Sequence, residues 1–405
     1  MDVHCEAAGP RGWNPGQREG GLFGACFMLD AMWPVALLLL VLAIPAAGQA
    51  PAAGKANADQ LLGMAVAAQQ RHDLKTAIAT YRKVLALQPD LVQARANLGA
   101  ALADDGQYAA AIEEDKKALA AMPANTGVRM NLGLAYYKNG DFAHAGLQFE
   151  RVLAQRPMDV SAAVLMGYVD IKLERPAEAL KLLTPLEPSH ESNMDLEYVL
   201  GYAQIQTGDD KDGVPRLERM ARTTNAVDAY VIAGTTRLHK REFHEARVDL
   251  DAAVKLNPEF PGLQTLVGQA RDALGDSTLA MPAFEAALQQ NPRDFMANLY
   301  LGTMWLKQRN FEKARPLLEE AAKLQPRAPM ARFELAKLNG LTGQYAEAAA
   351  TLEDLEKSDP GWLDPHVELA ALYYKLHRPA DGQRERDIVA KIQAQQQKAG
   401  PQNSQ

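Results

Sequence analysis

The stretch Leu132–Pro157 reads LGLAYYKNGDFAHAGLQFERVLAQRP and contains the marks of a two-helix unit. Gly133 follows an apolar residue in the first segment, and Asn139–Asp141 is a tight turn between the two segments. Ala145 and Phe149 are four residues apart, so they lie on one face of the second helix. The final proline cannot continue that helix. The stretch therefore predicts two helices joined by a short turn.

The same marks recur along the chain with a period of 34 residues. The interval from Pro157 to Pro258 is 101 residues, one less than three periods, so one residue is deleted between the two runs of prolines. Ten blocks in one register are a far stronger signal than a single match. The first small residue of each block is Ala65, Gly99, Gly133, Gly167, Gly201, Gly234, Gly268, Gly302, Ala336 or Ala370, and the terminal prolines are Pro89, Pro123, Pro157, Pro258, Pro292, Pro326 and Pro360.

This pattern resembles that of the tetratricopeptide-repeat (TPR) family, L-G-x2-Y…A-x3-F…P, from about Ala58 to Lys391. The small residues let the two helices approach closely, and the large residue of the second helix fills the space between repeats. One helix pair cannot bury its apolar stripe alone, so stacked neighbours form a common core. The resemblance implies an all-α, right-handed superhelical solenoid of about ten helix-turn-helix repeats over residues 58–391.

Several residues depart from the pattern. Glu191 and Asn225 replace the terminal proline in repeats four and five, and Thr184–Asp195 contains two early prolines. We therefore expect a short second helix in repeat four, followed by a bend or a longer loop. Asp115 stands at the large apolar place, and we expect it to swing out to solvent or to pair with a nearby Lys. Arg386 stands at the same place in the last block, where it suits the polar face of a terminal cap.

Residues 1–48 are expected to be a signal peptide or an N-terminal anchor with a disordered leader. The apolar run Ala31–Ile44 has the length of a signal-peptide core, and small residues follow it, which favours cleavage near Gly48 or Ala50. Both cysteines, Cys5 and Cys26, precede this run. A cleaved chain would contain no thiol, which suits an oxidising compartment. We expect a periplasmic or extracellular protein.

The alternative is an uncleaved anchor that tethers the protein to the membrane through residues 31–44. The stretch 22–44 is long enough to span a bilayer, although Asp30 would lie inside it. We expect residues 49–57 to be a flexible linker and residues 392–405 to be a polar cap and a disordered tail, with the disorder over 399–405.

The sequence contains no pattern typical of an enzyme. It has no phosphate loop, no G-x-S-x-G elbow and no His-Glu-x-x-His pair, and the net charge of -7 gives no basic footprint for nucleic acid. Asp209–Gly213 fits a solvated turn better than a calcium loop. His239 and His244 are five residues apart and flank a turn, so we interpret them as surface residues. We expect no cofactor and no metal.

The candidate site is the groove that the first helices line in TPR proteins, where the resemblance implies binding of a peptide. The lysine/asparagine clamp of chaperone-binding TPR domains is absent, because apolar residues such as Leu62, Ala96 and Leu134 hold its places. The apolar residues at groove places, rich in Tyr, suggest an interface. The competing interpretation is that they pack within and between repeats. The residues of this predicted groove are Met130, Asn131, Leu134, Tyr137, Val164, Tyr168, Ile171, Tyr198, Tyr202 and Ile205.

The sequence thus predicts a non-catalytic scaffold of the cell envelope, an exported TPR protein of bacterial type that binds a partner protein or peptide segment. One alternative is a membrane-tethered assembly factor for a secretion, pilus or polysaccharide system. Another is the TPR arm of a glycosyltransferase-like or carbohydrate-binding system.

Overall fold

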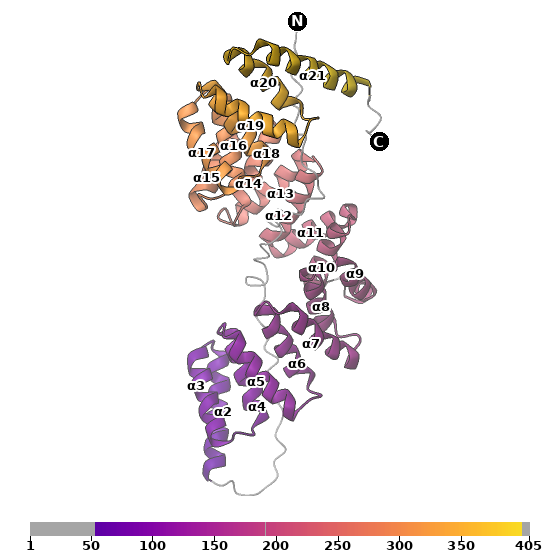
Figure 1. Cartoon of the computed structure of the whole chain (residues 1–405). Helices are drawn as coiled ribbons and strands as arrows, with labels where there is room; N and C mark the ends of the chain where they lie inside the picture. The colour runs from indigo at the N-terminus through magenta and orange to yellow at the C-terminus, as the bar shows by residue number, and fades with distance from the viewer. Residues whose placement is uncertain (1–52, 191, 399–405) are drawn as a thin grey trace. The chain divides into compact units, whose positions relative to one another are not determined.

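The computed structural model describes residues 53–190 and 192–398, and Figure 1 shows them as a succession of α-helices. That part of the chain forms twenty α-helices and one 3-10 helix, with no strand, which confirms the predicted all-α repeat solenoid. The chain divides into two compact units between Ile232 and Ala233, inside helix α12 (Val227–His239). We call residues 53–232 the N-terminal unit and residues 233–398 the C-terminal unit, and each is described by itself.

In the N-terminal unit, successive helices pack against each other in chain order. The first helices of neighbouring repeats also touch, α4 with α6, α6 with α8 and α8 with α10. The elements of this unit before α12 are α2 (Ala53–Gln70), α3 (Leu74–Leu87), α4 (Val92–Asp104), α5 (Tyr108–Ala121), α6 (Thr126–Lys138), α7 (Phe142–Gln155), α8 (Val160–Lys172), α9 (Pro176–Leu183), η1 (Thr184–Ser189), α10 (Met194–Gln206) and α11 (Asp210–Thr224).

The C-terminal unit repeats this arrangement, and its first helices touch in the order α14, α16, α18 and α20. Its elements after α12 are α13 (Phe243–Leu256), α14 (Leu263–Ala273), α15 (Ser277–Gln290), α16 (Phe295–Lys307), α17 (Phe311–Leu324), α18 (Pro329–Leu341), α19 (Tyr345–Ser358), α20 (Leu363–Lys375) and α21 (Pro379–Lys398).

Side-chain caps set where many of these helices begin. Asp and Asn residues just before the helices accept a hydrogen bond from the backbone N–H three residues further on. Each such cap stabilises its helix by about 1 kcal/mol. Gly140 lies in the turn before α7 with φ of 80°, in the left-handed region that glycine adopts at little cost. The capping residues of the N-terminal unit are Asp73, Asn125, Asp141, Asp159 and Asn193.

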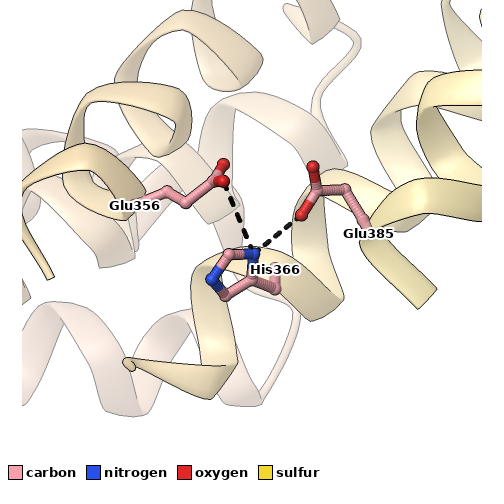
Figure 2. Close-up of side chains that lie close together, drawn as sticks. All are labelled: Glu356, His366 and Glu385. Carbon is pink, nitrogen blue, oxygen red and sulfur yellow. Dashed lines mark hydrogen bonds and ion pairs between the residues drawn. The ribbon is translucent and has the colours of Figure 1, made fainter. Parts of the chain in front are cut away.

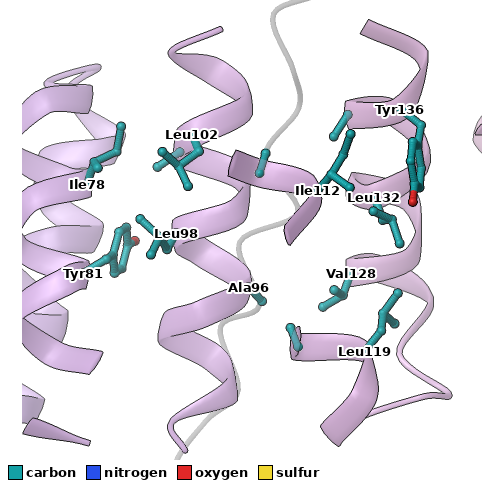
Figure 3. Packing of buried hydrophobic residues seen from close by; sticks show 14 of the residues in the cluster. Ile78, Tyr81, Ala96, Leu98, Leu102, Ile112, Leu119, Val128, Leu132 and Tyr136 are labelled. Carbon is teal, nitrogen blue, oxygen red and sulfur yellow. The ribbon is translucent and has the colours of Figure 1, made fainter. Parts of the chain in front are cut away.

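The small residues lie where two helices nearly touch. A Cβ atom on Gly133 would lie 2.5 Å from Cε1 of Phe149, and one on Gly268 would lie 2.5 Å from Cε1 of Phe284. Both rings are fully buried. In the first repeat Tyr81 holds the same place as Phe149, and Figure 3 shows it facing Leu98 of α4. The 34-residue register assigned from the sequence is therefore confirmed by the packing.

A second contact recurs in the same register and was not predicted. Arg129 lies four residues before the small residue of its repeat, and its Nη2 donates a hydrogen bond of 2.5 Å to the carbonyl of Pro123, at the end of the preceding repeat. Its Nη1 donates to Oε1 of Gln148 on the second helix, at 3.1 Å. We call this set of contacts the polar clamp. The bond to the proline carbonyl is also made by Arg95, Gln264 and Asn298.

In the last repeat the polar clamp contains a histidine. Nε2 of His366 lies 3.2 Å from the carbonyl oxygen of Pro360, and Nδ1 lies 2.7 Å from Oε2 of Glu385. Glu356 is a third partner, with its Oε1 at 3.9 Å from Nδ1 (Figure 2). His366 is 1% exposed and Glu385 is 7% exposed. The clamp here joins α19, α20 and α21.

The expectation for Asp115 is wrong. Its side chain is fully buried against Gly99, and neither carboxylate oxygen has a hydrogen-bond partner. The register explains the position, because Asp115 stands where Phe149 stands in the next repeat and the helix geometry directs it inward. Burial raises the pKa of Asp115 well above its usual range, and the neighbouring Glu114 adds to the effect.

The other departures behave largely as expected. Helix α9 has only eight residues and continues into η1, which contains Pro185 and Pro188. Asn225 ends α11 in the left-handed conformation with φ of 56°. Glu191 lies outside the described residues. Arg386 is exposed, and its guanidinium lies 4.6 Å from the centre of the Tyr374 ring.

The expected domain limits differ from the helix bounds at both ends. Helix α2 begins at Ala53, inside the expected linker 49–57, because its Ala-rich residues continue the helical register. Helix α21 runs to Lys398, so the first half of the expected tail 392–405 is helical. The expected leader, signal peptide or anchor over 1–48 and the expected disorder over 399–405 lie outside the described residues.

Replacing Asp115 by Leu should stabilise the protein by about 1–3 kcal/mol at neutral pH, because a buried polar group without a partner is costly. The folded-state pKa of Asp115 lies above the unfolded value of about 3.9, so the folded protein holds the proton more tightly. Stability contributed by this proton is present at low pH and is lost as the pH rises towards the folded-state pKa. Urea unfolding of both proteins from pH 4 to pH 8 should show the variant's advantage growing with pH. Asp90→Leu, at an exposed turn, is the control, and a constant advantage for Asp115→Leu would contradict the assignment.

Replacing His366 by Leu should destabilise the last repeat by about 1–3 kcal/mol, because Glu385 would be left buried without its partner. His366→Arg should lose much less, since Arg95 occupies this place in the second repeat and binds Glu114 as well as a proline carbonyl. Melting curves and hydrogen exchange over α19, α20 and α21 measure both effects. Equal losses of stability for the two variants would contradict this, because they would show that the shape of the histidine ring, and not its hydrogen bonds in the clamp, stabilises the last repeat.

Candidate peptide-binding surface

The ten residues of the predicted groove all lie on the first helices α6, α8 and α10 of the N-terminal unit. These three helices touch in sequence, so the ten side chains belong to one continuous part of the unit. Their exposure separates them into two groups, which the sequence alone did not distinguish.

Three of the ten are core residues. Tyr137 is 5% exposed, Val164 is 1% exposed and Tyr198 is 5% exposed. The ring of Tyr137 packs edge-on against Phe142 of the next helix, with 5.2 Å between ring centres. The prediction that these three line an accessible groove is therefore wrong. The Tyr137 ring packs against the second helix of its own repeat, and the Tyr198 ring lies against those of Tyr168 and Tyr202.

The remaining members are half-buried. Asn131 is the polar one. The six apolar ones pack against the core from its edge and keep part of their surface exposed. We call these six the apolar strip: Met130, Leu134, Tyr168, Ile171, Tyr202 and Ile205.

A stack of three tyrosine rings holds the centre of the apolar strip in place. The Tyr198 and Tyr202 rings lie 6.3 Å apart between centres and are nearly parallel, with an angle of 5°. The Tyr168 ring lies 6.0 Å from that of Tyr198. Such ring pairs contribute about 0.5–1.5 kcal/mol beyond their burial. The buried Tyr198 therefore fixes two half-buried rings on neighbouring repeats, and a fixed ring loses little entropy when a partner binds it.

The asparagines next to this region differ in role. Asn97 is 5% exposed and forms a side-chain hydrogen bond with Tyr81 of the preceding helix pair. That bond opposes the effect of burial, which raises the pKa of Tyr81 to about 12. Asn97 is thus a structural residue, while Asn131 keeps part of its surface exposed at the same repeat place.

Glu356, His366 and Glu385 form another polar cluster, one that sequence reasoning missed. Their ligand atoms lie within 4.8 Å of one another, a spacing that a metal ion can bridge. Burial, followed by the charge of Glu385, raises the pKa of Glu356. Both ring nitrogens of His366 are already engaged, by Glu385 and by the carbonyl oxygen of Pro360. We therefore assign the cluster to the polar clamp.

The signal for the clamp was present in the sequence. Polar side chains at the place four residues before the small residue recur at the repeat period, at Arg95, Arg129, Arg332 and His366. The apolar and small residues define the repeat by themselves, so this polar column was not predicted.

Among the described helices, none combines the length and the apolar character needed to cross a membrane. The expected tether through residues 31–44 lies outside the described part of the chain.

Several solved structures are similar to this chain. The crystal structure of YrrB, described as a TPR protein with an unusual peptide-binding site, is 20% identical, covers 44% of this chain and 92% of its own, and has a TM-score of 0.39. MamA from Desulfovibrio magneticus RS-1 is 20% identical over 42% of this chain and 96% of its own, with a TM-score of 0.38. Yeast Tom70 is 14% identical over 86% of this chain and 98% of its own, with a TM-score of 0.33.

A curated protein similar to this chain is anaphase-promoting complex subunit 3 of Schizosaccharomyces pombe, which is 21% identical over 150 residues. The match covers 37% of this chain and only 23% of that protein.

Family models described as tetratricopeptide repeat match both units of the chain. The matched residues are 62–126, 102–167, 233–295, 265–315 and 306–361, which together cover more than half of the sequence. Proteins built from these repeats are generally non-catalytic scaffolds for protein interaction. The chain belongs to the tetratricopeptide-repeat family.

Proposed function

We propose that this protein is a non-catalytic scaffold of the cell envelope that holds a segment of a partner protein against the apolar strip of the N-terminal unit. The observation behind the proposal is the stack of Tyr168, Tyr198 and Tyr202, in which a buried ring supports two half-buried ones. A tyrosine combines a large apolar face with a polar tip, so it can hold an apolar side chain and bond to a peptide backbone.

The form of the strip favours a peptide over a compact ligand. Its residues recur at matching places on α6, α8 and α10, so they present apolar surface at regular intervals across three repeats. An extended segment presents alternate side chains at regular intervals too. Asn131 supplies an amide beside the strip, and an amide can pair with the backbone groups of such a segment.

The location in the cell envelope rests on the sequence of the N-terminal region. An apolar run of signal-peptide length is followed by small residues, and both cysteines precede it. A membrane-tethered assembly factor is the second candidate, favoured by the length of the stretch 22–44.

Combining Tyr168→Ala with Tyr202→Ala should weaken binding of the partner segment and leave the fold intact. Truncating a true interface anchor costs about 2 kcal/mol or more of binding free energy. The matched control is Tyr198→Ala, which removes a buried ring and should lower the melting temperature, since loss of a buried aromatic ring costs about 3–5 kcal/mol. Melting curves are measured beside the recovery of partners from an envelope extract.

The outcomes separate the two interpretations of the strip. Reduced recovery, with a loss of melting temperature much smaller than that of Tyr198→Ala, supports the proposal. A melting temperature that falls as far as that of Tyr198→Ala would make the strip part of the core. Unchanged melting and unchanged recovery would place binding elsewhere in the chain.

Export should yield a mature chain that begins near Gln49 and lies outside the cytoplasm. N-terminal sequencing together with cell fractionation measures both. A membrane-bound chain that retains residues 31–44 would favour the tethered assembly factor. A soluble cytoplasmic chain that retains Cys26 would contradict both versions.

A further inference from the structure

A row of carboxylates lies across first helices of the C-terminal unit. Glu334 on α18 and Glu368 on α20 are 34 residues apart, so they hold the same repeat place on neighbouring helices that touch. Asp364 lies one turn before Glu368 on α20. We call Glu334, Asp364 and Glu368 the acidic row.

Glu334 is the unusual member of the row. It is 7% exposed, and its Oε2 atom has no hydrogen-bond partner. Among the described residues, no cation lies within ion-pair distance of Glu334 or Glu368. A buried carboxylate without a partner is costly, and its cost falls when a cation reaches it.

The charges around Glu334 include the other members of the row, which lie on the neighbouring helix α20. Burial is the main cause that raises the pKa of Glu334, while Lys337 and Lys307 lower it. Glu368 and Asp364 raise it further, so the carboxylates of α18 and α20 share one electrostatic environment. Burial likewise raises the pKa of Glu368. The region contains two lysines and three carboxylates, so its local net charge is negative when all five groups are ionised.

Aromatic side chains border the row and engage some of its charges. The Trp362 ring lies 5.2 Å from that of Phe333, and its Nε1 donates a hydrogen bond of 3.1 Å to Asp364. The Nζ of Lys337 lies 5.9 Å from the centre of the Phe333 ring. Lys337 therefore already lies near one aromatic ring, that of Phe333. The half-buried Trp362 ring is a second aromatic surface that a cation from a partner can contact.

The spacing of the carboxylates favours an organic cation over a metal ion. In the described part of the chain, the cluster with metal-ligand spacing is Glu356, His366 and Glu385, and no member of the acidic row belongs to it. A lysine or arginine side chain has several donors on a long stem, so it can reach carboxylates on two helices. Charge complementarity thus selects a positively charged polypeptide segment.

We propose that the acidic row is a second binding surface of this protein, in the C-terminal unit, and that it takes a lysine- or arginine-bearing segment of a partner polypeptide with Glu334 as the buried acceptor. This surface is separate from the apolar strip, so the proposal does not depend on the function proposed for the N-terminal unit.

The test is a titration of the full chain with a fluorescein-labelled peptide of alternating lysine and serine, followed by fluorescence anisotropy. Glu334→Gln and Glu368→Gln should each raise the Kd by about tenfold, because charge-assisted bonds are lost. Lys337→Gln should lower the Kd, since it removes a competing internal cation. The control is Glu347→Gln on α19, an exposed acid outside the row, which should leave the Kd unchanged.

Circular dichroism of each variant verifies folding, and the isosteric changes should not lower the melting temperature. The Tyr168→Ala, Tyr202→Ala protein should bind the lysine peptide as the wild type does. Failure to bind the lysine peptide would overturn the proposal. So would equal binding of a glutamate–serine peptide, or Glu334→Gln and Glu368→Gln variants with the affinity of Glu347→Gln.

Discussion

The close approach of two helix backbones at one small residue is the constraint on which the structure depends. At Gly133 the ring of Phe149 occupies the space that a Cβ would need, and Gly268 and Phe284 repeat the arrangement in the other unit. Because the ring reaches the partner backbone, it is fully buried. This contact fixes which faces of the two helices turn inward.

The polar clamp supplies a hydrogen-bond donor to a backbone carbonyl group that lies at the junction between two repeats. Proline ends the second helix of a repeat and leaves a carbonyl group at the junction with the next one. A donor from the next first helix, such as Arg129, bonds to that carbonyl and to the second helix of its own repeat. The full clamp is made by Arg95, Arg129 and His366, whereas Gln264 and Asn298 make only the bond to the proline carbonyl.

The fold could be predicted from the sequence because the constraint leaves a visible trace, a small residue and a large one at a fixed period. The candidate site could be predicted only in part. Tyr137, Val164 and Tyr198 occupy groove places in the register, yet their side chains are buried. Exposure depends on how side chains pack in three dimensions, which the period of the sequence does not reveal. Asp115 failed for the opposite reason, since its polarity suggested solvent while the register directed it inward.

The two helices of a repeat differ in which residues they bury, and this difference explains where binding surfaces can arise. Second helices such as α7 and α15 contribute the large buried residue, so their inward places tolerate little change. The place two residues before the small residue of a first helix varies in both chemistry and burial: Asn97, Leu165 and Val199 are buried there, whereas Asn131 is half-buried. The same place holds Asn131 on α6, Tyr300 on α16, Glu334 on α18 and Glu368 on α20. The apolar strip occupies other places of the first helix, one and four residues after the small residue and, at Met130, three before it. One scaffold therefore carries an apolar, tyrosine-rich surface in one unit and the acidic row in the other. The packing constraint remains the same in both, and only the residues that it leaves free decide what each surface recognises.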